Sequence, residues 1–159
     1  MFALRNLVVA TAVFATACDG TKRQNRPLPE AFRAVTLTDD LLDHQTLKGQ
    51  AWVISVWRPD CAPCLRQLRV LDTLKAKHAA QAVGFVALSL ETDEALVYAA
   101  AEKAEIDSTL AYSDEVMGPL GLKTLPSTVF LDASATIVAS LAGEGDEATL
   151  EKWLQVVSK

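Results

Sequence analysis

The segment 51–57, AWVISVW, is nearly continuous in apolar and β-prone residues. A strand of that composition is buried on both faces, as happens in a parallel or mixed sheet covered by helices. Pro59 ends this strand, and from Ala62 onward leucines recur at helical spacing with charged residues mostly on the other side. The sequence therefore predicts a buried strand, a tight turn and a helix, which together indicate an α/β fold.

The rest of the chain continues to alternate between strand and helix patterns. Asp93 and Asp146 each precede a helical pattern and are suited to cap its N-terminus. We expect the order β-β-α-β-α-β-β-α in one domain over residues 31–159, with the last two strands forming a hairpin. Besides 51–57 and the helix from 62, the expected strands are 34–38, 85–90, 127–132 and 136–141, with a short edge strand at 109–112; the expected helices are 94–106 and 147–158; and 38–50 and 116–126 are expected to be turn-rich.

Length and charge restrict the class of protein. The 159 residues suffice for one domain with a hydrophobic core, and 22% charged residues are typical of a globular chain. The formal net charge is −5, and no basic stripe of the kind that binds phosphate backbones is visible. We therefore expect no nucleic-acid partner, and we expect the domain to be a monomer.

Residues 1–17 have the features of a secretory signal peptide. Arg5 supplies a basic start, and the apolar run Leu7–Ala17 is shorter than the roughly 20 residues that span a bilayer. Cys18 follows two small residues at the positions that a signal peptidase reads, which resembles a bacterial lipobox whose cysteine is acylated. Asp19 resembles a signal that keeps such lipoproteins at the inner membrane. Plain cleavage and an uncut anchor are the alternatives.

Residues 18–30 are polar, basic and proline-containing, which predicts a tether between membrane and domain. Every interpretation of the N-terminus exports the domain. We expect it on the periplasmic side of the bacterial inner membrane, anchored through Cys18 or, alternatively, soluble in the periplasm. A disulfide persists in such an oxidising compartment.

Cys61 and Cys64 are the candidate catalytic residues. Cys61 falls at the predicted start of a helix, where free backbone N–H groups and the helix dipole favour a thiolate. We therefore expect its pKa to lie below the value of about 8.5 for a free cysteine. Cys64 lies one turn further and is placed to attack a mixed disulfide. Pro63 stiffens the loop at an early helical position, where its missing N–H costs nothing.

Charged neighbours act on the same thiolate in opposite directions. Arg58 and Arg66 are expected to stabilise it, whereas Asp60 opposes it.

Other roles for the cysteine pair stay open. A structural disulfide of this spacing closes a small loop and stabilises little. Zinc would need four ligands, and neither His44 nor His78 has ligand spacing with the pair. Copper(I) remains an alternative because two thiolates suit a soft metal. A redox-inert binding module is a third interpretation.

A family resemblance rests on several of these motifs together. The strand ending in Val56-Trp57, followed by Cys-Ala-Pro-Cys and a helix, looks like the thioredoxin fold, and the whole resembles the exported TlpA-like and ResA-like thiol–disulfide oxidoreductases. The segment 124–132, TLPSTVFLD, matches the family's Leu-Pro-Ser/Thr-Thr segment, and Gly143 matches its closing glycine. The resemblance covers residues 32–157.

The resemblance implies a thioredoxin-like fold with a central mixed β-sheet flanked by helices on both faces. It also implies a cis Leu125–Pro126 bond, with the backbone of Leu125 free to pair with an incoming peptide strand. Trp57 is expected beside the active loop, contacting substrate or packing. The resemblance implies no cofactor other than the redox-active disulfide of Cys61 and Cys64.

This chain also departs from the family pattern. Asp60 stands where tryptophan is usual, Gln67 where glutamate is usual, and Arg69 where proline is usual. Ser55 occupies a position that often holds a buried Asp or Asn. Two groups that could shuttle protons beneath Cys64 are therefore missing. Gln67 is either a supporting residue or a surface residue without a role.

These observations lead to one preferred function. We expect an exported reductase of disulfides in client proteins with cysteine pairs, such as apocytochromes c or copper-site assembly proteins. A membrane thiol-relay protein is the expected electron source. The alternative is a copper(I)-binding chaperone that uses the same cysteine pair.

Overall fold

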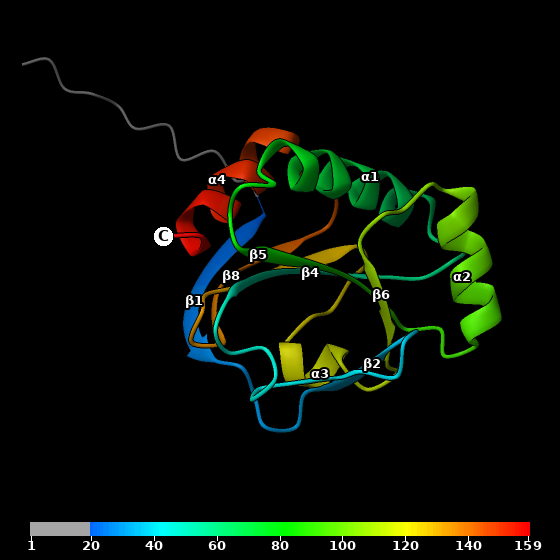
Figure 1. Ribbon diagram of the computed structural model, residues 1–159, viewed down its shortest axis with the longest axis horizontal. Coiled ribbons are helices and arrows are strands. Elements are labelled where there is room, and N and C mark those ends of the chain that lie inside the picture. Colours follow the sequence, from blue (N-terminus) through cyan, green and yellow to red (C-terminus); the bar gives the residue numbers. More distant parts are fainter. Residues whose placement is uncertain (1–19) are drawn as a thin grey trace, which may run out of the picture.

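Eight strands form one mixed sheet in the computed structural model, which describes residues 20–159 (Figure 1). The strand order is β1-β8-β7-β4-β5-β6-β2-β3, in which β4, β5 and β6 are parallel and the other neighbours antiparallel. The strands are β1 Thr21–Pro27, β2 Arg33–Thr36, β3 Leu41–Asp43, β4 Ala51–Trp57, β5 Val83–Ser89, β6 Thr109–Tyr112, β7 Ser127–Leu131 and β8 Thr136–Ala142.

Helices cover both faces of this sheet. The helices are α1 Ala62–Lys77, α2 Glu94–Lys103, α3 Met117–Leu120 and α4 Glu147–Val157. Figure 1 shows α1 and α4 above the sheet and α3 below it. Leu71 of α1 and Trp153 of α4 pack in one cluster with Phe130 of β7, whereas Leu120 of α3 packs with Ile54 of β4 on the opposite face. The expected thioredoxin-like α/β fold is confirmed.

The apolar run 51–57 explains the position of β4. This strand lies between β5 and β7, so successive side chains enter the two separate cores. Six of its seven residues are buried, as a strand covered on both faces requires. The tight turn 58–61 then leads directly into α1 and leaves the cysteines at the end of a central strand.

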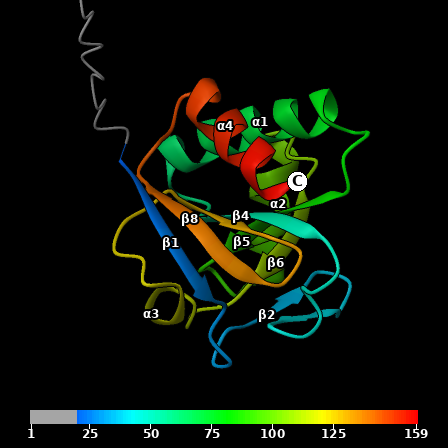
Figure 2. The same cartoon turned by 90° about the vertical axis from the view of Figure 1, so that its left-hand side faces the viewer.

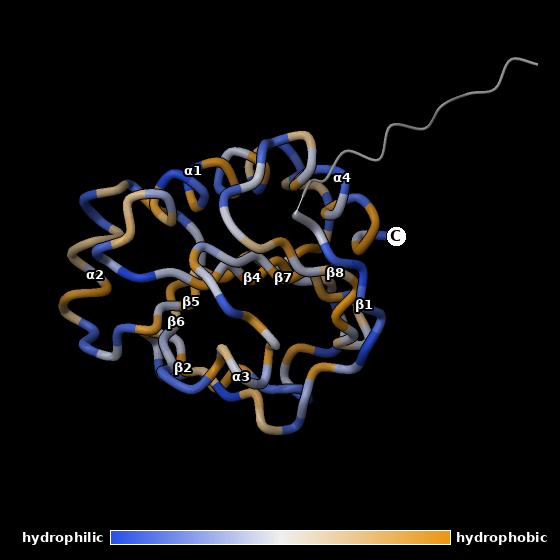
Figure 3. Tube along the Cα trace, turned by 180° about the vertical axis from the view of Figure 1, so that it is seen from behind, coloured by the Kyte–Doolittle hydropathy of each residue, from blue (hydrophilic) through white to orange (hydrophobic). Residues whose placement is uncertain are grey.

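The prediction of a tether over residues 18–30 is wrong for Thr21–Pro27. These residues form β1, which pairs antiparallel with β8 from Thr21 opposite Leu141 to Pro27 opposite Thr136. Figure 2 shows β1 at the edge of the sheet beside β8, and Figure 3 shows that it is mostly hydrophilic. An edge strand can keep polar side chains in water while its backbone hydrogen bonds fix it, so an apolar pattern is not needed.

Smaller differences concern the other side of the sheet. The strand at 109–112 is internal, not an edge, because β2 pairs with its outer side. The turn-rich segments contain the short elements β3 and α3.

The expected signal peptide 1–17 and Cys18 lie outside the described residues. Within residues 20–159, no helix has the length and apolar character needed to cross a bilayer.

Candidate active site

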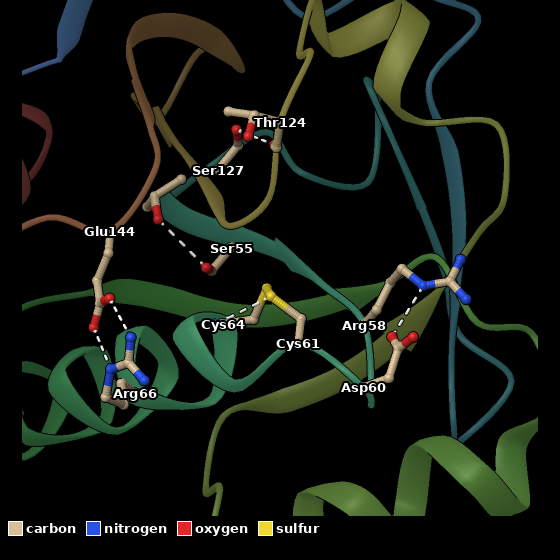
Figure 4. The surroundings of a disulfide bond; sticks show 10 residues. Ser55, Arg58, Asp60, Cys61, Cys64, Arg66, Thr124, Ser127 and Glu144 are labelled. Carbon is tan, nitrogen blue, oxygen red and sulfur yellow. Dashed lines mark hydrogen bonds and ion pairs between the residues drawn. A yellow bond between two sulfur atoms is a disulfide. The ribbon is translucent and has the colours of Figure 1, made fainter.

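Cys61 and Cys64 are joined by a disulfide bond at the start of α1 (Figure 4). Cys61 is the N-cap residue, and its Sγ accepts a hydrogen bond from the backbone N–H of Cys64 at 3.3 Å. Pro63 lies in the first turn of the helix, as expected from its missing N–H. A backbone N–H of the first helical turn is therefore directed at the Cys61 sulfur, an arrangement that favours negative charge on it.

The two sulfurs differ in exposure. Cys64 is 0% exposed, whereas Cys61 is only partly buried. Leu68, Ala87 and Val97 pack around Cys64, so solvent and large substrates reach the disulfide from the Cys61 side. An incoming thiol or disulfide therefore meets Cys61 first.

Trp57 belongs to the same apolar cluster. Its side chain is 0% exposed and packs with Cys64 and Leu68. The expectation that Trp57 contacts substrate does not fit this burial. Its position at the buried end of β4 makes it a packing residue that supports the first turn of α1.

The segment around Pro126 lies beside the disulfide. The Leu125–Pro126 peptide bond is cis, as the family resemblance implied. Leu125 packs in the cluster that contains both cysteines, and Figure 4 shows Thr124 and Ser127 in the surroundings of the disulfide. The Ser127 hydroxyl donates to the Thr124 carbonyl at 2.7 Å, which closes this turn. Pro126 itself is buried, so Thr124 and Leu125 form the accessible part of the segment.

Arg58 and Arg66 do not point to the sulfurs but pair with carboxylates. Arg58 Nε lies 3.2 Å from Asp60, and both side chains are exposed. Arg66 forms a two-pronged pair with Glu144 at 2.9 and 2.8 Å. The hydrogen bond and the opposite charge raise the pKa of Arg66 and lower the pKa of Glu144. The predicted stabilisation of the Cys61 thiolate by these two guanidinium groups is therefore not seen in their contacts.

Gln67 is a buried connector. It is 0% exposed, and its Oε1 accepts a hydrogen bond from the backbone N–H of Gly145 at 2.7 Å. Its Nε2 is buried and has no hydrogen-bond partner among the described residues. Gly143 N–H in the same loop donates to the Pro126 carbonyl at 2.8 Å. The loop 143–145 thus links the helix that carries the cysteines to the cis-proline segment. Of the two expectations for Gln67, this contact favours a supporting residue over a surface residue without a role.

Sequence reasoning missed two partners at this site. Thr128 donates to the hydroxyl of Ser55 at 3.3 Å in a fully buried pair between β7 and β4. Glu144 forms an ion pair with Arg66 and so fixes the Arg66 side chain on the surface. The adjacency of Thr128 to the Leu-Pro-Ser motif was a usable signal, whereas the loop that holds Glu144 approaches α1 only through the tertiary fold.

Comparisons with known proteins agree with this geometry. Residues 23–154 match the Redoxin family. The thiol–disulfide oxidoreductase ResA of a Bacillus cereus strain is 22% identical over 129 residues, which are 80% of this chain and 75% of that protein. A thioredoxin-family thiol:disulfide interchange protein of Chlorobium tepidum superposes with a TM-score of 0.70 at 17% identity, over 87% of this chain and 99% of that one.

A secreted disulfide oxidoreductase of Mycobacterium tuberculosis has the same fold, with a TM-score of 0.65 and 22% identity over 79% of this chain and 95% of that one. Because the family match covers most of the chain and the motif cysteines form a disulfide at the start of α1, the chain belongs to the Redoxin family and is a TlpA/ResA-like thiol–disulfide oxidoreductase of the thioredoxin superfamily.

Proposed function

We propose that this protein reduces disulfides in exported client proteins, with Cys61 as the attacking residue and Cys64 as the resolving residue. The observation that carries the proposal is the difference between the two sulfurs. Cys61 is partly exposed and receives a backbone N–H, whereas Cys64 is wholly buried behind it. A client disulfide can therefore meet only one of them directly.

The exchange has two steps that balance. The Cys61 thiolate attacks one sulfur of the client disulfide, which forms a mixed disulfide and releases the other client sulfur as a thiolate. The Cys64 thiol then loses its proton and attacks Cys61 Sγ, which releases the second client thiol and leaves the Cys61–Cys64 disulfide. Two electrons have passed to the client, and a dithiol reductant, expected to be a membrane thiol-relay protein, must restore them.

A pair of serine variants tests these roles. Cys61→Ser should abolish the reduction of a model protein disulfide, whereas Cys64→Ser should still attack and accumulate a mixed disulfide through Cys61. The adduct is measured on non-reducing gels and located by peptide mass spectrometry. Retained turnover in Cys61→Ser would exclude the proposal, and an adduct on Cys64 in that variant would reverse the two roles.

The direction of electron flow has its own test. Equilibration of the pair against glutathione gives its potential, and we expect a value of about −270 mV or below, as for a reductant. A value near −120 mV would instead make the protein an oxidant.

Copper(I) binding by the same pair is the alternative inferred from the sequence, and titration of the reduced protein with copper(I) separates it from catalysis. Stoichiometric binding that needs both thiols, without disulfide turnover, would replace the present proposal.

We propose a periplasmic location on the inner membrane, with Cys18 as the acylated residue. The sequence of residues 1–18 supports this location, and the secreted mycobacterial neighbour supports export. In a bacterial host, Cys18→Ala should move the protein from the membrane to the soluble periplasmic fraction. Unchanged membrane association, with no incorporation of labelled palmitate in the wild type, would contradict lipid anchoring.

A further inference from the structure

A groove separates β1 from the segment that leads into β7. Its volume is about 560 Å³, and this β1 groove is partly open to solvent. Its polar walls come from two elements that are far apart in the sequence. The walls are formed by Lys22, Gln24 and Arg26 of β1 and by Lys123, Thr124 and Ser127 of the second segment.

The charge of the β1 groove is of one sign. Lys22, Arg26 and Lys123 line it, and no Asp or Glu of residues 20–159 is among its lining residues. Among residues 20–159, none of these three cations has a carboxylate within ion-pair distance. In a chain with a net charge of −5, this concentration of unneutralised positive charge is a local exception.

Arg26 is held in place without being neutralised. Its Nη2 donates to the Leu120 carbonyl at 2.8 Å and its Nε donates to Gln24 Oε1 at 2.6 Å. Gly121 leaves room for the guanidinium, since a Cβ at that position would lie 3.3 Å from Nη2. Carbonyl and amide acceptors leave the full charge in place, and a guanidinium has five N–H donors, so some remain for a ligand.

One end of the groove adjoins the segment that lies beside the redox centre, since Leu125, next to Thr124, packs with both cysteines. Thr124 and Ser127 line it and also flank the Leu125–Pro126 bond beside the disulfide (Figure 4). A polypeptide whose disulfide lies at Cys61 and which extends past Thr124 therefore meets the positive walls.

We propose that the β1 groove binds carboxylate side chains of the client polypeptide next to the disulfide that is reduced, so that the preferred substrates have acidic residues flanking a cystine. This inference rests on the proposed function and specifies its substrate class. An acidic polypeptide is favoured over a membrane surface because Lys123 precedes Thr124 and Leu125, the accessible residues of the segment beside the disulfide, where only a client sulfur has a role.

The test uses two peptides with the same disulfide loop, one flanked by Asp and Glu and the other by Ser and Gln. The second-order rate constant for reduction by the wild-type protein should be about tenfold higher for the acidic peptide at low ionic strength. The preference should shrink at about 0.5 M NaCl because salt screens the attraction. Lys22→Glu/Lys123→Glu should lower the ratio of the two rates to about one or below. Lys48→Glu/Lys152→Glu changes the net charge equally, away from the groove, and should retain the preference.

Each other outcome points to a different failure. Equal rates for both peptides with the wild-type protein would overturn the inference and leave the proposed function standing. A preference lost equally in the control variant would overturn it as well, because only net charge would matter. Binding to phosphatidylglycerol vesicles that needs Lys22 and Lys123, without a peptide preference, would assign the groove to the membrane. If neither peptide is reduced, the proposed function fails and the inference fails with it.

Discussion

Two basic segments of this chain, α1 and β1, use their charges differently. Three of the four basic side chains of α1 meet carboxylates from other elements at 2.8–2.9 Å: Arg66 with Glu144, Lys75 with Asp107 and Lys77 with Glu151. Lys22 and Arg26 of β1 face a groove in which the described part of the chain places no carboxylate. Both segments are rich in basic residues, but those of the first fix a helix to its surroundings and those of the second leave positive charge available. The partner of a charge, not its presence in the sequence, therefore decides whether it stabilises the fold or stays available to a ligand.

The largest loss of stability should come from breaking the hydrogen bond between Gln67 of α1 and Gly145. Gln67→Ala removes the acceptor of the Gly145 N–H and leaves a cavity, so we expect the free energy of unfolding to fall by about 2–3 kcal/mol. Gln67→Met keeps the volume and removes the unpartnered Nε2, so it should cost less than half of that. Urea unfolding measures both values. Equal losses in the two variants would show that the hydrogen bond to Gly145, not the packing, dominates.

Substitution of Arg26 should give a smaller effect, because the Arg26 guanidinium is held by hydrogen bonds to uncharged acceptors. Arg26→Ala removes the contacts with Gln24 and the Leu120 carbonyl, and we expect a loss of about 1 kcal/mol in unfolding free energy. Arg26→Lys keeps the charge without the planar fork, so it should restore the peptide preference more than the stability. A fully stable Arg26→Ala protein would contradict the fixed guanidinium.

The exposed pair of Arg66 and Glu144 should contribute less. Hydrogen bonding to Arg66 and its charge hold the Glu144 pKa below its ordinary value of 4.5, and Arg66 stays charged throughout the acid range because the pKa of a guanidinium lies far above it. The contribution of the pair is thus complete above pH 4.5 and is lost as the pH falls through the lowered pKa of the folded state. In a double-mutant cycle with Arg66→Ala and Glu144→Ala, the coupling should amount to at most about 3 °C in Tm at about pH 7.

That coupling should also shrink in about 1 M NaCl, since both side chains are exposed. A coupling that grows as the pH falls from about 5 to about 3 would contradict the assigned direction of the Glu144 shift.

The smallest change in stability is expected for substitutions in the β1 groove. Neither lysine forms an ion pair with another residue of 20–159, so Lys22→Ala/Lys123→Ala should change Tm by no more than about 2 °C while the preference for the acidic peptide falls. Differential scanning calorimetry and the peptide assay on the same preparation separate the two effects. A large loss of Tm would mean that these lysines stabilise the fold, as the basic residues of α1 do.

The sequence predicts the redox centre better than its surroundings. Three local signals locate Cys61 and Cys64, namely the apolar run of β4, Pro59 and the leucine spacing of α1. Each of these signals depends only on residues that are close together in the chain. β1 depends on pairing between Thr21 and Leu141, which no local pattern of TKRQNRP indicates. Likewise β6 is internal only because β2 crosses to its outer side.

Gln67 shows the same limit within the active site. Its position on α1 was visible in the sequence, but its burial follows from the loop around Gly145, which comes 78 residues later. The positive groove was equally hidden, because its two walls meet only when β1 joins the sheet.

The account depends most on one asymmetry, namely that the reduced protein presents Cys61 to other molecules and hides Cys64. A limiting amount of iodoacetamide, followed by peptide mass spectrometry, measures it directly, and the urea-unfolded protein provides the control in which both cysteines react. We predict that the folded protein carries the label on Cys61 almost alone. Equal labelling of the two cysteines, or faster labelling of Cys64, would contradict the account.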